Sequence, residues 1–244
     1  MDAHEWATTS DWIAVWKSLS ILEGADRKRR LIATELCRPL LPYIANERFG
    51  QFVGLSSALG ECQPFEEEDW DNWEDAMDDV ADLATEVTTA VEEAAVWVVV
   101  GLKNDDHKIG RALESLPHFY GCLSILNAGI IQRDTPVEDA QELRSHPSYM
   151  SGHDEFGPRH IIEMIREVAG NPYKPIAFDP SWCTEAVVAL ARGMYESRNF
   201  APMPVLADAL DDAGCDHPDV LAHCRGAGPH VRGCWVVDLV LGKA

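Results

Sequence analysis

The residues best suited to chemistry lie close together near the C-terminus. Cysteine and histidine are side chains that zinc prefers as ligands, and six of them fall within twenty residues. Their spacing is not that of a zinc finger, because the run holds no Cys-x-x-Cys pair. We therefore favour buried thiols and hydrogen-bonded imidazoles between short helices, with a zinc site as the alternative. The six candidate ligands are Cys215, His217, His223, Cys224, His230 and Cys234.

One of these thiols has neighbours that could activate it. His223 and Arg225 flank Cys224, and cationic neighbours lower the pKa of a thiol. A nucleophilic cysteine also needs a base within hydrogen-bond reach and an oxyanion site, and this sequence indicates neither. We favour a packed structural cysteine, and a thiol-dependent enzyme is the alternative.

The sequence lacks the common catalytic fingerprints. It contains no His-Glu-x-x-His, Gly-x-Ser-x-Gly, Walker-type or dinucleotide-binding pattern. The Glu-x-x-His motif of di-iron bundles is also missing. We therefore lean towards a non-enzymatic protein that has no cofactor unless the Cys/His cluster binds zinc.

A second feature is a dense run of acidic residues in a chain whose net charge is −21. Fourteen acids and no Lys or Arg lie between Glu61 and Glu93. This charge disfavours direct binding to nucleic acids or anionic membranes, both of which attract basic proteins. The alternatives are a solvated face with an internal partner, a docking surface for a basic protein, and mimicry of a nucleic-acid backbone. The docking residues that we predict are Glu67, Glu68, Trp70, Asp71, Trp73, Glu74, Asp75, Asp78, Asp79 and Asp82.

The acidic run also carries a helical pattern. Apolar or small residues recur at alternating steps of three and four, which predicts one long helix over residues 66–102 that packs lengthwise on others or on a second copy of the chain. Four valines within residues 96–100 leave a strand as the local alternative. The seam consists of Trp70, Trp73, Met77, Val80, Ala84, Val87, Val91, Ala94 and Val98.

The remaining periodicity predicts an all-α, multi-helix bundle organised around this long acidic helix. In the C-terminal part we predict a cluster of short helices over residues 158–169, 184–197, 203–213, 218–225 and 230–241. The polar stretch 134–157 separates them from the N-terminal part as a linker or a functional loop. The predicted organisation is thus an N-terminal bundle over 1–133 and a C-terminal helical region over 158–244.

The compartment is predicted from two observations. The N-terminus lacks the basic and apolar regions of a signal peptide, and no apolar run approaches the roughly 20 residues that span a bilayer. Seven cysteines, an odd number, favour reduced thiols over a disulfide framework. We therefore expect a cytoplasmic protein.

The C-terminal region also resembles a known group. The run from His223-Cys-Arg-Gly to Pro229-His-Val-Arg-Gly-Cys-Trp-Val-Val-Asp-Leu-Val-Leu-Gly-Lys243 is similar to the C-terminal region of a large group of uncharacterised planctomycete proteins. Asn171-Pro-Tyr-Lys-Pro175, Phe178-Asp-Pro-Ser-Trp182 and Asp26-Arg-Lys-Arg-Arg-Leu31 resemble the same group. Its members carry a long helix rich in alanine and arginine where this chain is acidic. The resemblance implies no activity.

The sequence thus favours a non-enzymatic interaction or regulatory protein that docks a protein partner through its acidic face. The rival is a metalloprotein or a thiol-dependent enzyme that uses the C-terminal cluster. A nucleic-acid mimic and a structural unit that forms homo-oligomers are further alternatives.

Overall fold

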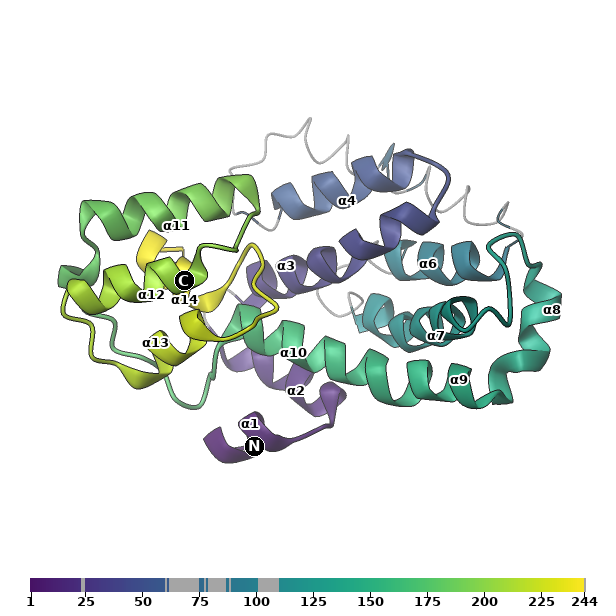
Figure 1. The fold of residues 1–244 in the computed structure, drawn as a ribbon, viewed down its shortest axis with the longest axis horizontal. Helices are drawn as coiled ribbons and strands as arrows, with labels where there is room; N and C mark the ends of the chain where they lie inside the picture. The colour runs from purple at the N-terminus through teal and green to yellow at the C-terminus, as the bar shows by residue number, and fades with distance from the viewer. Residues whose placement is uncertain are drawn as a thin grey trace. The chain divides into compact units, whose positions relative to one another are not determined.

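The chain folds into α-helices joined by short 3-10 and π-helical turns, as the computed structural model in Figure 1 shows. The structure describes residues 1–22, 25–59, 61, 75–76, 78, 87, 89–100 and 110–243. Over these residues no strand occurs, and the predicted all-α class is confirmed. In chain order the elements are α1 (Ala3–Thr8), α2 (Trp12–Ser18), η1 (Leu19–Ile21), α3 (Ala25–Cys37), η2 (Arg38–Tyr43), α4 (Arg48–Leu59), α6 (Ala90–Val100), α7 (Gly110–Asn127), α8 (Val137–Gln141), η5 (Glu142–Ser145), α9 (Pro147–Met150), η6 (Ser151–Phe156), α10 (Gly157–Ala169), η7 (Pro180–Trp182), α11 (Glu185–Ser197), α12 (Met203–Asp212), α13 (Pro218–Arg225) and α14 (Trp235–Leu241).

These elements form two compact units. The first unit comprises Met1–Thr9, Lys17–Ala25 and Glu163–Ala244. The second comprises Ser10–Trp16 and Asp26–Ile162. The division falls inside α10, so the predicted boundary at 134–157 lies elsewhere. That stretch is largely helical, and both α9 and η6 pack on α7 within the second unit, so it is not a linker between the two units.

The first unit is built around the predicted cluster of short C-terminal helices. α12 packs on α11 and α13, and α14 packs on α11, as Figure 1 shows. Apolar side chains from these helices meet in a core and are completely buried. They include Val187 and Ala191 of α11, Leu206 of α12, and Val236 and Val237 of α14. Burying apolar surface is the main driving force for this packing.

An N-terminal helix belongs to the same unit. The six residues of α1 are too few to form a stable helix alone. Asp2 caps its first turn, because its side chain accepts hydrogen bonds from the amides of His4 and Glu5. At the other end, the Arg166 guanidinium donates hydrogen bonds to the carbonyl oxygens of Trp6 and Thr9.

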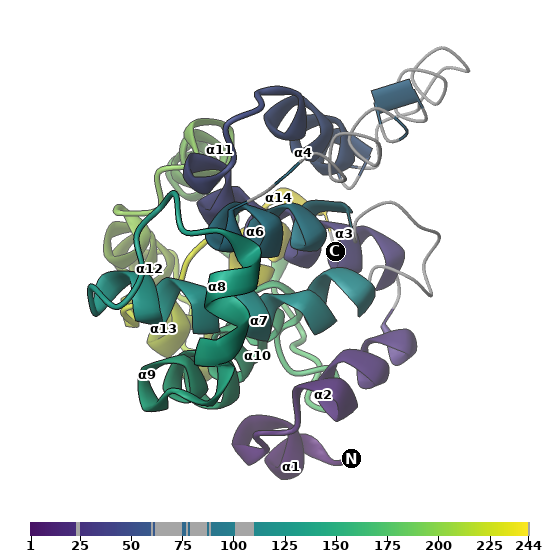
Figure 2. The same ribbon diagram turned by 90° about the vertical axis from the view of Figure 1, so that its right-hand side faces the viewer.

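The second unit is centred on α6 and α7, which lie side by side in Figures 1 and 2. Three residues of the predicted seam, Val91, Ala94 and Val98, are buried on α6. Residues 96–100 are helical, so the strand alternative for them is wrong.

The predicted continuous helix over 66–102 is interrupted. Val87 is not helical, and α6 begins only at Ala90. Thr89 forms an antiparallel bridge with Pro136, and the amide of Ala90 donates to the carbonyl oxygen of Thr135 at 3.0 Å. Threonine is favoured just before a helix, where its short polar side chain can cap it, and less so in the interior. Within the predicted helix, residues 66–74, 77, 79–86, 88, 101 and 102 lie outside the described residues.

Among the described helices, none is both long enough and apolar enough to cross a bilayer.

The second unit depends on close backbone contacts at glycine. η6 is a π-helical turn packed on α7, and a Cβ atom at its Gly152 would clash with the Tyr120 carbonyl oxygen and lie 2.8 Å from Ser124 Cβ. We expect Gly152→Ala to lower the free energy of unfolding by about 2 kcal/mol, because α7 and η6 would have to separate. Gly54→Ala is the matched control, since Gly54 lies in α4 with no atom within 4 Å of the added methyl. The control should raise stability by about 0.5–1 kcal/mol in urea unfolding. An equal effect of the two substitutions would contradict this packing.

Candidate metal centre

Four polar side chains that are distant in sequence meet in the first unit. They are Glu167 of α10, His223 of α13, His230, and Cys234, which directly precedes α14. One ligand atom from each lies within 4.8 Å of the others. His223 Nε2 lies 3.2 Å from Cys234 Sγ and 3.3 Å from Glu167 Oε2, and His230 Nδ1 lies 3.2 Å from Glu167 Oε1.

The path of the chain before α14 brings these groups together. The sequence predicts one helix over 230–241, but α14 begins at Trp235 and leaves His230 in an irregular segment. Gly170 ends α10 with a positive φ of 65°. A Cβ atom at Gly170 would lie 3.1 Å from Trp235 Cγ, so the missing side chain lets the start of α14 approach the end of α10. Glu167 therefore faces the segment that carries His230 and Cys234.

Glu167 is the buried charge of this cluster, with 4% of its surface exposed. Burial alone raises the pKa of its carboxyl group, but the hydrogen bonds from His223 and His230 outweigh burial and lower it. The carboxylate is therefore ionised and depends on the two imidazoles.

His230 faces an oxygen acceptor on each side of its ring. Its Nδ1 lies next to the Glu167 carboxylate, and its Nε2 lies 3.2 Å from the carbonyl oxygen of Gly226. Burial lowers the pKa of His230, but its hydrogen bond to Glu167 and the charge of that carboxylate raise it above the ordinary value. Because both neighbours only accept, both ring nitrogens donate in this arrangement.

The outer ring nitrogen of His223 faces a hydrogen-bond donor, whereas that of His230 faces an acceptor. The indole Nε1 of Trp235 donates a hydrogen bond to His223 Nδ1 at 3.2 Å. An indole N–H can only donate, so Nδ1 accepts and the ring hydrogen is on Nε2. The Nε2–H then points towards Glu167 and Cys234.

The thiols of this region are poor nucleophiles. Cys234 is completely buried, and burial together with the charge of Glu167 raises its pKa well above the ordinary value. Burial raises the pKa of Cys224 to about 12, and this side chain is also completely buried. A thiol of this kind is not ionised at neutral pH, whereas a nucleophilic cysteine reacts as the thiolate.

A pocket of about 250 Å³ opens beside the cluster. Three of the four cluster residues line it, whereas Cys234 is completely buried. A ligand could therefore reach the imidazoles and the carboxylate from solvent. The lining residues are Glu163, Arg166, Glu167, His223, Gly226, Ala227, Gly228, Pro229 and His230.

The structure brings together half of the six predicted ligands. His223, His230 and Cys234 belong to the cluster. Cys215 and Cys224 instead pack in the apolar core, and the metal-ligand cluster does not include His217. Sequence reasoning missed Glu167. The signal that could have found it is its position, because this acid follows the buried Met164 by three residues on an amphipathic helix.

The predicted docking residues are described only at two positions. Asp75 and Asp78 are helical and exposed. The other predicted docking residues, Glu67, Glu68, Trp70, Asp71, Trp73, Glu74, Asp79 and Asp82, lie outside the described residues.

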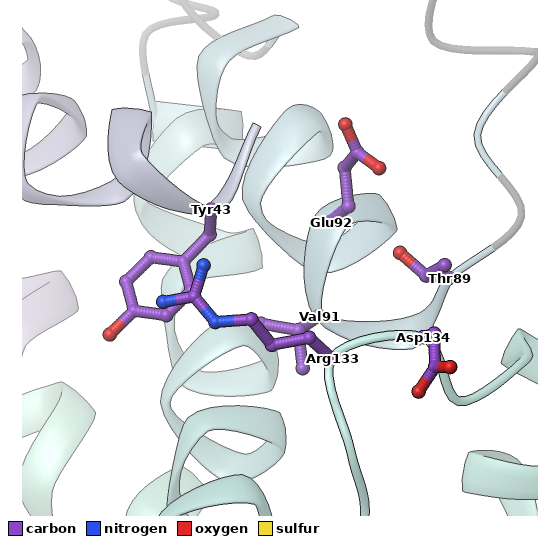
Figure 3. A pocket seen from close by; sticks show the side chains of 6 residues that line it. All are labelled: Tyr43, Thr89, Val91, Glu92, Arg133 and Asp134. Carbon is purple, nitrogen blue, oxygen red and sulfur yellow. The ribbon is translucent and has the colours of Figure 1, made fainter. Parts of the chain in front are cut away.

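A second pocket, of about 240 Å³, lies at the start of α6 in the second unit (Figure 3). The Arg133 guanidinium covers the ring of Tyr43 at 5.0 Å from the ring centroid, and Figure 3 shows this stacking. Glu92 Oε1 accepts a hydrogen bond of 2.7 Å from the amide of Ala45. Because Arg133 and Glu92 each contact the segment that contains Tyr43 and Ala45, we assign the pocket a structural role.

Comparison with protein-family models, with curated proteins and with solved structures finds no match for this chain. The resemblance of its C-terminal region to the planctomycete group therefore stays a prediction.

The cluster predicts that neutralising either of two carboxylates of α10 changes the free energy of unfolding by unequal amounts. Glu167→Gln, measured with a chelator present, should lower the free energy of unfolding by about 2–3 kcal/mol, because it leaves the half-buried imidazolium of His230 without its counter-charge. The control is Glu163→Gln, one turn earlier and exposed, which should change stability by less than about 0.5 kcal/mol. Comparable losses in urea unfolding would show that Glu167 is not the charge that organises the cluster.

Proposed function

We propose that this chain is a metal-binding protein, in which Glu167, His223, His230 and Cys234 surround one divalent transition metal. The observation that carries the proposal is the convergence of the four candidate ligand atoms within 4.8 Å. In a tetrahedral zinc site, bond lengths of 2.0–2.3 Å separate neighbouring ligand atoms by roughly 3.3–3.6 Å. The observed separations of 3.2 and 3.3 Å are close to these values.

The donor set favours zinc. Sulfur, imidazole nitrogen and carboxylate oxygen are a mixture that suits a borderline-soft ion, whereas calcium and magnesium prefer oxygen alone. Zinc would also satisfy the charge of the site, because a thiolate and a carboxylate balance its two positive charges. Binding would release the protons of Cys234 and His230.

The expected consequence is a metal-dependent first unit. Glu167 lies on α10, and His230 and Cys234 lie before α14, so one ion would join two parts of the chain more than 60 residues apart. A ligand that binds only the folded state stabilises it by mass action. The proposed centre would stabilise the packing of the C-terminal helices and so keep their surface ready for a partner.

The first test is the effect of zinc on unfolding. Zinc at about 1,000 times its Kd should raise the free energy of unfolding of the chelator-treated protein by about 4 kcal/mol. Cys234→Ser and His230→Ala should lose this gain. Cys183→Ser is the matched control, because Cys183 lies outside the cluster, and it should keep the gain. The proposal fails if zinc does not stabilise the wild type, or stabilises the Cys234→Ser variant equally.

A second candidate function is the docking of a basic protein on the acidic segment. It is supported by the exposure of Asp75 and Asp78, which lie three residues apart in helical conformation within the run of fourteen acids. Residues at this spacing share one helix face and can meet one basic surface. Cytoplasmic location, homo-oligomers and mimicry of nucleic acid remain further predictions.

The docking candidate is tested by charge reversal. Asp75→Lys with Asp78→Lys should weaken binding of a short lysine peptide by about tenfold, because two favourable charges become repulsive. Asp212→Lys with Asp216→Lys changes the net charge equally at exposed positions of the first unit, and should cost less than about threefold. Equal losses of affinity, measured by calorimetry at physiological salt, would show that the acidic segment acts only through its contribution to net charge.

A further inference from the structure

The four residues of the cluster differ in the hydrogen bonds behind them, and this difference deepens the proposed function on which it rests. We infer that Glu167, His230 and Cys234 hold the metal, and that His223 donates an N–H hydrogen bond to a small external ligand in the fourth position. That ligand is a water molecule or a small anion that enters from the adjacent pocket.

The argument begins at the outer nitrogen of each imidazole. A metal-bound histidine almost always donates its other ring N–H to a carbonyl, carboxylate or water. His230 meets this condition, because its Nε2 faces the carbonyl oxygen of Gly226 at 3.2 Å while its Nδ1 faces the cluster. His230 is therefore already oriented as a ligand.

His223 fails the same condition. Its outer nitrogen, Nδ1, accepts the hydrogen bond from the indole of Trp235 at 3.2 Å. A neutral imidazole that accepts at Nδ1 carries its hydrogen on Nε2, the nitrogen that faces the cluster. To bind a metal through Nε2, His223 would have to lose this hydrogen and become an imidazolate, or the indole hydrogen bond would have to break. As a donor, His223 needs neither change.

The remaining donors complete an open site. Glu167, His230 and Cys234 provide one oxygen, one nitrogen and one sulfur, and three protein ligands are the number in zinc sites that keep a fourth position for water or substrate. His223 Nε2 lies 3.2 Å from Cys234 Sγ and 3.3 Å from Glu167 Oε2, which are the distances of a group that donates to metal ligands and their neighbours.

The pocket supplies the route to the fourth position. Glu167, His223 and His230 all line the pocket of about 250 Å³, and the small-residue segment Gly226-Ala227-Gly228-Pro229 also lines it. Arg166 also lines it and adds a positive charge, whereas Glu163 adds a negative one. These features suit a small ligand that coordinates through an electron pair and accepts a hydrogen bond.

The test replaces zinc by cobalt(II), whose visible spectrum reports its ligands, and adds sodium azide as the external anion. We expect cobalt to give a thiolate charge-transfer band that disappears in Cys234→Ser, and azide to change the visible bands of the wild type. The azide Kd should rise at least about tenfold in cobalt-loaded His223→Gln, because the hydrogen bond to the anion is lost. His217→Gln, a histidine outside the cluster, is the control and should leave the azide Kd unchanged within about twofold.

The outcomes separate this inference from the proposal on which it rests. If cobalt binds but azide leaves the wild-type spectrum unchanged, the fourth position is not open to an external ligand. If His223→Gln no longer loads cobalt, His223 is itself a ligand. Either result overturns the inference. If the wild type gives no thiolate band with cobalt, the metal centre itself is refuted. Trp235→Phe supplies a second variant, because without the indole donor His223 can move its hydrogen to Nδ1 and bind the metal. Azide should then lose its effect on the spectrum, and an undiminished azide response in Trp235→Phe would also overturn the inference.

Discussion

The first unit depends on a buried carboxylate whose charge must be compensated. Glu167 is 4% exposed, and transferring an ionised carboxylate from water to a protein interior costs several kcal/mol unless partners repay it. Its partners come from the far end of the chain, since His223 lies at the end of α13 and His230 in the segment before α14. The path of the chain from His223 to its end is therefore constrained by polar groups as well as by the apolar core. The non-helical course of 230–234 follows from this requirement.

The same geometry can balance the carboxylate in two ways. In the arrangement of the structure, an imidazolium at His230 supplies the positive charge and Cys234 remains a thiol. In the arrangement that we propose, a divalent metal supplies it, and both protons leave. Because the ligand atoms already lie within 4.8 Å, the exchange needs little movement of the backbone. In this proposal, the hydrogen bond from Trp235 distinguishes His223, a hydrogen-bond donor, from His230, a metal ligand.

Sequence periodicity predicted the helices of the C-terminal part, because apolar stripes, prolines and glycines act locally. It correctly predicted α11, α12 and α13 to within about two residues, a normal scatter for helix ends. It failed where a long-range contact competes with the local pattern. The acidic helix is interrupted at Val87 and Thr89 because Thr89 pairs with Pro136, 47 residues away. The last helix begins late because the segment before it turns back to Glu167.

The same limit applies to the candidate site. His223, His230 and Cys234 were visible as a cluster because they lie within twelve residues of one another. Glu167 lies 56 residues before His223, so no spacing rule could assign it to them. Its position on the buried face of α10 was the only local sign, and an acid at such a position needs a partner that sequence alone does not name. The separation of Cys224 from His223 did follow from helix geometry, since adjacent residues point in different directions.

The most direct measurement is the zinc K-edge X-ray absorption spectrum of the protein purified without chelator. Our account predicts one zinc ion per chain with a single sulfur neighbour at about 2.3 Å and nitrogen or oxygen neighbours at about 2.0 Å. The sulfur signal should vanish in Cys234→Ser. A protein without bound metal, or a zinc ion surrounded by oxygen and nitrogen alone, would contradict a centre built on Glu167, His230 and Cys234.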